Sequence, residues 1–587
     1  MKLLTTLFLA ASTVASFAIA ETIDPLKVTV TATRFDSLIS HIPQSIVTIS
    51  KKDIEQNQFK NLSEVLEAIS GIYVARSGTL GSITSTFIRG AESNHTVILI
   101  DGMRIVSSND GQVSIGQIPL NSVDKIEIIK GGASTAYGAD AVGGVINIIT
   151  KSHVQKTENE LTITAGNLST KEIDFSHSQS IQGYKLNFGL NKFNTKGFDA
   201  KTPPDDADGF NKKSLFLSIS KDFDDLSLSL KTSSWTGDSN YDGGWSGDTQ
   251  HFENYFVNFA TTYFLEKHSI KAITNIQSNR STEYFEGSPV SSGSLSKVNN
   301  KGFDLSVNSL LNKNYSQTLG YSYFDERTAT QSRYNQGIHW LGEISLNQST
   351  DLQLGLRRDF SSQYGSNNTW SSGIVRRFGS KGRIFANYRT SFSPATFLDL
   401  NPAFYNPTPD PLPEKAKSLE IGSDININRT QKASLTLFET KFKDKIAYES
   451  GTMINIDKAK AKGIDVSFIN NWERATLKVS HVVTIAEDDQ GAQLLKRPKY
   501  QTTLNMNYHL NDKTKFTIRG EYLGQIASSG TTDKISYTLW AASLNHNFND
   551  NFSAGIRVEN IFDKEYSPLY GYNGRPQYLE ASLKYKF

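Results

Sequence analysis

The chain has 587 residues, with 61 Lys and Arg against 59 Asp and Glu, and a formal net charge of +2. This balance gives no indication of a nucleic-acid partner. Because the chain has 0 Cys, disulfides and thiolate metal sites are excluded. No run of about 18 apolar residues follows the N-terminal segment, which excludes a helical membrane protein.

The first twenty residues (1–20) predict a secretory signal peptide. Lys2 gives a positive start, Leu3 to Phe17 is almost wholly apolar, and Ala18 and Ala20 are the small residues that signal peptidase requires. An N-terminal membrane anchor is the alternative, but this apolar core is too short for a stable span. The mature chain is expected to begin near residue 21, outside the cytoplasm.

Residues 21–43 predict a polar, extended leader, in which the β-branched segment 27–32 is isolated from other strands. Residues 44–152 predict a small mixed α/β domain. Here Asn61 can cap a helix that stops before Gly71. The expected strands are Ser45–Ser50, Ser85–Ile88, Thr96–Ile100, Lys125–Lys130 and Val145–Thr150.

Three charged residues, Arg89, Glu127 and Lys130, stand inside otherwise apolar strands of this domain. A buried charge is costly unless it is paired. We therefore expect them to meet one another or charged side chains of a surrounding wall.

Residues 153–587 show repeated hairpins with period-two alternation. In the last strand Leu579, Leu583 and Phe587 belong to an apolar stripe, while Glu580 belongs to the polar one. The period alone fits a soluble sandwich or a membrane barrel, but an aromatic final residue favours a barrel. At roughly 20 residues per strand with its connection, the segment makes about 22 antiparallel strands, the size whose wide lumen is plugged.

Several ordered blocks resemble TonB-dependent outer-membrane receptors, and the resemblance runs from end to end. The blocks are Phe87 to Gly90, Val97 to Gly102, Val123 to Gly132, Ala136 to Thr150, Asn406 to Lys415 and Asn560 to Tyr566. The resemblance implies a transmembrane β-barrel with the mixed α/β domain as a plug inside its lumen. It also implies a monomer in the outer membrane of a Gram-negative bacterium, in contact with lipid, with no catalytic activity and no redox cofactor.

The leader holds a segment that resembles the TonB box of this family. A short β-prone segment can add as a strand to the sheet edge of a partner, and the implied partner is TonB with its energising complex. Without the family resemblance, the segment would be interpreted as a disordered leader that happens to be β-rich. The expected TonB box is Leu26, Lys27, Val28, Thr29, Val30, Thr31 and Ala32.

Acidic residues gather between positions 199 and 248. Several carboxylates in loops suit Ca²⁺, although Asp-Gly pairs are also ordinary turns. Within the family the chain most resembles cobalamin receptors, which implies that a calcium site orders the substrate loops, although Pro203-Pro204 stands where a Gln ligand is expected. The implied ligands are Asp199, Asp206, Asp208, Tyr241, Asp242 and Asp248.

The same resemblance implies that cobalamin is the imported substrate. The implied contacts are Ile83, Ser85, Glu92, Asp110, Gly111 and Arg497. A siderophore or haem receptor is the alternative within the class; a haem receptor would need a His or Tyr axial ligand, and the chain has only 10 His with no His-rich loop. A barrel enzyme and a passive porin are alternatives of other classes, disfavoured by the plug and by the lack of a convincing catalytic triad.

Overall fold

The computed structural model describes residues 29–587, apart from 31–33, 35–36, 107, 155, 202–205, 244–246, 286, 291–294, 402–409 and 450–451. The predicted signal peptide and the predicted TonB-box residues Leu26, Lys27, Val28, Thr31 and Ala32 lie outside the described residues. Among the described helices, none has the length and apolar character that a membrane crossing requires.

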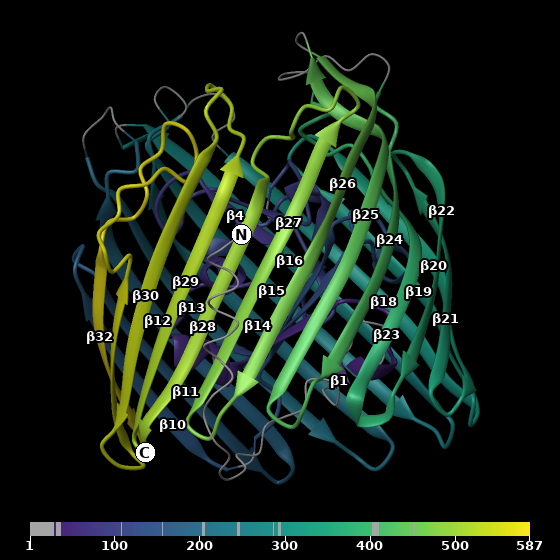
Figure 1. The fold of residues 1–587 in the computed structure, drawn as a ribbon, viewed down its shortest axis with the longest axis horizontal. Coiled ribbons are helices and arrows are strands. Elements are labelled where there is room, and N and C mark those ends of the chain that lie inside the picture. Colours follow the sequence, from purple (N-terminus) through teal and green to yellow (C-terminus); the bar gives the residue numbers. More distant parts are fainter. Residues whose placement is uncertain are drawn as a thin grey trace.

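The larger part of the chain is a closed antiparallel barrel that runs from β10 to β32 (Figure 1). Of these 23 labelled strands, β17 only extends the hairpin of β16, which pairs directly with β18, so 22 strands form the wall. The predicted barrel and strand number are thus confirmed. The strands are β10 Glu158–Gly166, β11 Lys171–Ile181, β12 Tyr184–Phe198, β13 Asp208–Asp222, β14 Leu226–Asn240, β15 Thr249–Phe264, β16 His268–Phe285, β17 Ser288–Pro289, β18 Leu295–Asn312, β19 Tyr315–Arg327, β20 Ser332–Asn347, β21 Thr350–Ser361, β22 Gly365–Arg377, β23 Gly382–Ser393, β24 Glu414–Asn426, β25 Gln431–Glu449, β26 Thr452–Asn471, β27 Ala475–Asp488, β28 Pro498–Asn511, β29 Thr514–Ile526, β30 Ile535–Asn547, β31 Phe552–Glu559 and β32 Tyr578–Lys586.

The last strand shows which way the alternating faces point. β32 closes the barrel against β10, with Tyr585 opposite Leu161. Leu583 is 57% exposed on the outer face, whereas Glu580 is 1% exposed inside. The apolar stripe therefore faces outward, as a lipid-embedded barrel requires, and the charged stripe faces the lumen.

The two ends of the barrel differ in their connections. Short turns such as 223–225, 265–267 and 512–513 lie at the end where β32 finishes, and longer loops such as 241–248 and 560–577 lie at the other end (Figure 1). In outer-membrane barrels the short turns are periplasmic and the long loops extracellular. The end with the short turns is therefore the periplasmic end, and the end with the long loops is the extracellular end.

The plug lies inside the lumen (purple in Figure 1) and is built on a five-stranded sheet of order β3-β8-β9-β6-β7, beside the hairpin β4-β5. The predicted plug strands are confirmed to within a residue or two. The plug strands are β3 Ile46–Ser50, β4 Ile72–Arg76, β5 Thr84–Ile88, β6 Thr96–Ile100, β7 Met103–Ile105, β8 Val123–Lys130 and β9 Gly144–Thr150. The helices are α2 Lys51–Asn57, α3 Leu62–Glu67 and α4 Ser134–Tyr137, with short 3-10 turns at Ile39–His41, Ser93–His95, Ile115–Gln117 and, in the barrel, Gly379–Lys381.

Capping residues explain where the plug helices begin. The Asn61 side chain accepts a hydrogen bond from the Glu64 backbone N–H at 3.0 Å, which confirms the predicted cap of α3. Helix α2 was not predicted. It begins at a capping box in which Ser50 and Asp53 each satisfy the other's backbone N–H.

The charges predicted to need partners in the plug find them. Arg89 lies 3.0 Å from Glu420 and Lys130 lies 2.9 Å from Asp465, both on the barrel wall. Glu127 pairs at 2.7 Å with Lys125 of its own strand. Two of the three charges thus fix the plug to the wall.

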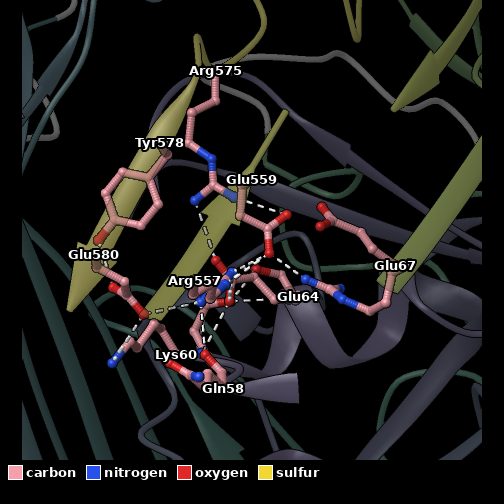
Figure 2. A network of polar contacts seen from close by, with 12 residues as sticks. Gln58, Lys60, Glu64, Glu67, Arg557, Glu559, Arg575, Tyr578 and Glu580 are labelled. Atoms are coloured by element: carbon pink, nitrogen blue, oxygen red, sulfur yellow. Dashed lines mark hydrogen bonds and ion pairs between the residues drawn. The ribbon is translucent and has the colours of Figure 1, made fainter. Parts of the chain in front are cut away.

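A second set of plug–wall ion pairs, here called the Arg557 network, lies between helix α3 and strands β31 and β32 (Figure 2). Arg557 is 1% exposed and lies 2.9 Å from Glu64, 2.7 Å from Glu559 and 3.6 Å from Glu580. Arg575 approaches Glu64 at 3.3 Å, and Lys60 approaches Glu580 at 3.3 Å. Charged groups of both signs from the plug and from the wall thus share one buried layer.

We expect Arg557→Ala to loosen the plug, because Glu64 loses its shortest ion pair while it remains buried. Removing one partner of a buried ion pair costs about 3–5 kcal/mol. The urea concentration at which the plug becomes sensitive to protease should fall, and Arg557→Lys should restore part of the loss. An unchanged midpoint in Arg557→Ala would show that the network contributes no stability.

Candidate functional site

Acidic residues from two extracellular loops converge above the strand pair β12-β13. Asp199 follows β12, and Asp208 begins β13, where it is 3% exposed and accepts a hydrogen bond from the Ala200 N–H at 3.0 Å. Asp206 is exposed in the same loop. Asp242 comes from the loop after β14. Four of the predicted calcium ligands therefore lie near one another.

The electrostatics of Asp242 show how close these groups are. Burial and the negative charges of Asp206 and Asp199 hold the pKa of the Asp242 carboxyl above its usual range, while a hydrogen bond with Asp208 opposes the shift. One oxygen of Asp242, Oδ2, is buried and has no hydrogen-bond partner among the described residues. Converging carboxylates with an unsatisfied buried oxygen fit a hard cation such as Ca²⁺.

Tyr241 and Asp248 close the loop beside this cluster. The Tyr241 N–H donates to the Asp248 carbonyl at 2.8 Å, and the Asp248 N–H donates to the Tyr284 carbonyl at 2.7 Å. Burial, with the nearby charges of Glu283 and Asp248, raises the pKa of the Tyr241 phenol to about 12. Glu283 was not predicted from the sequence, because a single Glu at the end of a strand carries no distinguishing signal.

Gly197 makes this corner possible. It has a φ of +68°, and a Cβ at this position would lie 1.8 Å from the Asp208 carbonyl oxygen. We therefore expect Gly197→Ala to push β12 and β13 apart and to displace Asp208. Isothermal calorimetry should show weaker Ca²⁺ binding with the barrel still folded, whereas Gly183→Ala in the periplasmic turn serves as the control. Equal Ca²⁺ affinity in Gly197→Ala and the native chain would show that Gly197 is not needed to position Asp208.

The apex of the plug brings four of the predicted substrate contacts together. Ile83 is 65% exposed, and Ser85 donates a hydrogen bond to Gln112 at 3.0 Å. Gln112 in turn donates through its side chain to Asp110 at 2.7 Å, beside Gly111 with its φ of +74°. These two loops form one polar surface with an apolar tip beneath the extracellular mouth.

The other two predicted contacts, Glu92 and Arg497, are paired with each other. They lie 2.7 Å apart, and Lys445 lies 2.9 Å from the same Glu92 carboxylate. Arg497 is 5% exposed and also donates to the Gly90 carbonyl at 3.2 Å. The structure thus places them in a plug–wall contact beside the apex, and their role toward a substrate stays a prediction.

The sequence predicted that the leader segment is isolated from other strands, and this prediction is wrong. β1 (Thr29–Val30) pairs with β2 (Ser37–Leu38) in an antiparallel hairpin. Val30 is 0% exposed and packs in an apolar cluster with Ile42 of the leader and with Val97 and Ile129 of the plug. Burial of the apolar Val30 side chain stabilises the contact between the leader and the plug. The sequence pattern alone did not reveal this contact.

Comparisons with known proteins agree with this architecture. A family model for the β-barrel of TonB-dependent receptors matches residues 157–561, and one for their plug domain matches residues 39–145. The chain belongs to the TonB-dependent receptors, which are outer-membrane β-barrel proteins of Gram-negative bacteria.

Among curated proteins, the chain is 28% identical over 602 residues to the vitamin B12 transporter BtuB of Vibrio vulnificus, covering 95% of each chain. It is 28% identical to the BtuB of Photobacterium profundum, again over 95% of each chain. Among solved structures, the siderophore receptor PirA of Acinetobacter baumannii matches with a TM-score of 0.81 and 19% identity, over 92% of this chain and 98% of that one. The ferric enterobactin receptor PfeA of Pseudomonas aeruginosa matches with a TM-score of 0.82 and 16% identity, over 93% and 100%. At these identities the structures support the fold alone.

Proposed function

We propose that this receptor imports cobalamin across the outer membrane in a TonB-dependent manner. The curated relatives, vitamin B12 transporters similar along 95% of both chains, support cobalamin as the substrate. The observation within the structure that carries the proposal is the convergence of Asp199, Asp206, Asp208 and Asp242 at the extracellular mouth.

We propose that these four carboxylates, with Tyr241 and Asp248, hold Ca²⁺. A bound Ca²⁺ would neutralise their repulsion and tie together the loops that follow β12 and β14. The loop after β31 is already joined to this region, because Asn573 donates to the carbonyl of Asp199 at 3.1 Å. Ordered loops above the apex residues Ile83 and Ser85 would form the walls of the substrate site.

A large polar corrinoid would be held by many weak contacts from the apex and these loops. Binding at the mouth is coupled, in this proposal, to the leader at the periplasmic side, where TonB adds to the TonB-box strand and pulls. The chain's own residues bind and orient the substrate, and no chemical step is involved. A siderophore is the second candidate substrate class, favoured only by the fold shared with PirA and PfeA.

A binding titration tests the proposed substrate. The purified protein in detergent is titrated with cyanocobalamin, with Ca²⁺ or with a chelator of Ca²⁺, beside ferric catecholate and hydroxamate chelates. We expect saturable cobalamin binding that Ca²⁺ strengthens by about 5–150-fold, the usual range of coupling between two sites. Saturable binding of a ferric chelate without cobalamin binding would overturn the assignment.

A further inference from the structure

Two cavities lie between the plug and the same side of the barrel wall. The upper cavity has a volume of about 140 Å³ and lies beneath the extracellular loops. Its lining includes Tyr73 and Arg76 of the plug, Glu521 and Tyr537 of the wall, and Phe198 at the end of β12. Its walls are mixed aromatic and charged.

The lower cavity has a volume of about 810 Å³ and lies at the periplasmic end. Plug residues Lys51 and Lys60 line it on one side, and wall residues Lys212, Asn545 and Lys586 line it on the other. Lys212 is 4% exposed and has no ion pair or hydrogen bond among the described residues. Its side chain lines this cavity together with the carboxylates of Glu172 and Asp174.

The Arg557 network lies between the two cavities. Glu559, Arg575 and Tyr578 line the upper cavity, and Gln58 and Lys60 line the lower one. The three groups between them, Glu64, Arg557 and Glu580, line neither cavity and are 3%, 1% and 1% exposed. Figure 2 shows these side chains as one connected layer.

From this arrangement we propose that the two cavities are the ends of one transit route between plug and wall, closed at rest by the layer of Glu64, Arg557 and Glu580. The proposal rests on the proposed import function, since it names the path by which a hydrophilic solute leaves the mouth. It places that path beside the plug, along α3 and strands β29–β32.

The distribution of partners makes this layer able to open. If α3 moves away with Glu64, Arg557 keeps Glu559 at 2.7 Å and Glu580 at 3.6 Å, both on the wall. Arg575 likewise keeps Glu559 at 3.7 Å. No cation of the wall is left without a carboxylate, so the wall avoids the penalty of an unpaired buried charge when α3 moves.

Current across a planar lipid bilayer tests the route without any substrate. Glu64→Gln with Arg557→Gln removes the central ion pair, while Glu559 keeps Arg519 and Glu580 keeps Lys60. We expect stepwise ion currents that the native protein lacks. The matched control is Lys130→Gln with Asp465→Asn, which removes a buried plug–wall pair of 2.9 Å outside the layer; it should stay silent. Glu64→Gln alone, with weaker currents expected, serves if the double variant fails to insert.

A thiol reagent locates the current, because the chain has 0 Cys of its own. Thr162→Cys places a single thiol in the lining of the lower cavity. A charged methanethiosulfonate should block most of the current in Glu64→Gln/Arg557→Gln/Thr162→Cys and leave the parent double variant unchanged. The absence of current in both Glu64 variants would overturn the proposed route. Current in the Thr162→Cys variant that the reagent does not reduce would also overturn it. Because no corrinoid is used, this result is independent of the cobalamin titration.

Discussion

Uptake is expected to fall to background when Val30 is replaced by proline, while substrate binding at the mouth stays unchanged. Val30 pairs with Ser37 in the resting leader, and the proposed strand addition to TonB uses the same backbone groups. Proline lacks the N–H that such pairing requires, so it cannot donate to the ladder of hydrogen bonds with the added strand. Uptake of radiolabelled cobalamin by cells and equilibrium binding to the purified protein measure the two effects separately.

Val30→Ala is the matched control for this prediction. It removes the side chain that is 0% exposed against the plug but keeps the backbone N–H. If backbone pairing transmits the pull, this variant should retain most of the uptake. Transport that survives Val30→Pro would count against energised import through the leader.

The second large effect is expected at the acidic cluster. Asp206→Asn with Asp208→Asn removes two charges while nearly preserving side-chain shape, so the loops can fold but lose cation affinity. Mutation of residues that only support the metal ligands typically lowers metal affinity about 10–100-fold. The loss of two ligand charges should lower the Ca²⁺ affinity by more than that. Calorimetric titration with Ca²⁺ should show this loss, and added Ca²⁺ should no longer strengthen cobalamin binding.

Asp224→Asn with Asp225→Asn is the control, since these exposed carboxylates lie in the periplasmic turn between β13 and β14. It should leave Ca²⁺ affinity unchanged. Native affinity for both Ca²⁺ and cobalamin in the Asp206/Asp208 variant would remove the calcium site from the proposal.

The barrel could be predicted because its information is local. Alternation of Leu583 and Glu580 within β32 assigns one face to lipid and the other to the lumen without any knowledge of partners. Five of the seven described plug strands were similarly predicted from short β-prone runs, whereas β4 and β7 were not predicted. The cap of α3 by Asn61 depends on residues only three apart, and it too was predicted.

Contacts between distant residues could not be predicted. Arg557 and Glu64 are 493 positions apart, and only the closure of the barrel around the plug brings them to 2.9 Å. The pairing of Glu92 with Arg497 has the same origin, and so does the position of Glu283 beside Tyr241. Alternation indicates that such charges face the lumen, but it does not identify their partners.

Uptake in whole cells measures energised import of cobalamin itself. The receptor is expressed in a Gram-negative strain that lacks its own cobalamin receptor, with the TonB protein present or deleted, and entry of radiolabelled cyanocobalamin is followed with time. Accumulation should exceed the surface-bound amount only when TonB is present. Equal accumulation without TonB, or no accumulation beyond that of the empty strain with TonB, would show that the receptor does not import cobalamin in a TonB-dependent manner.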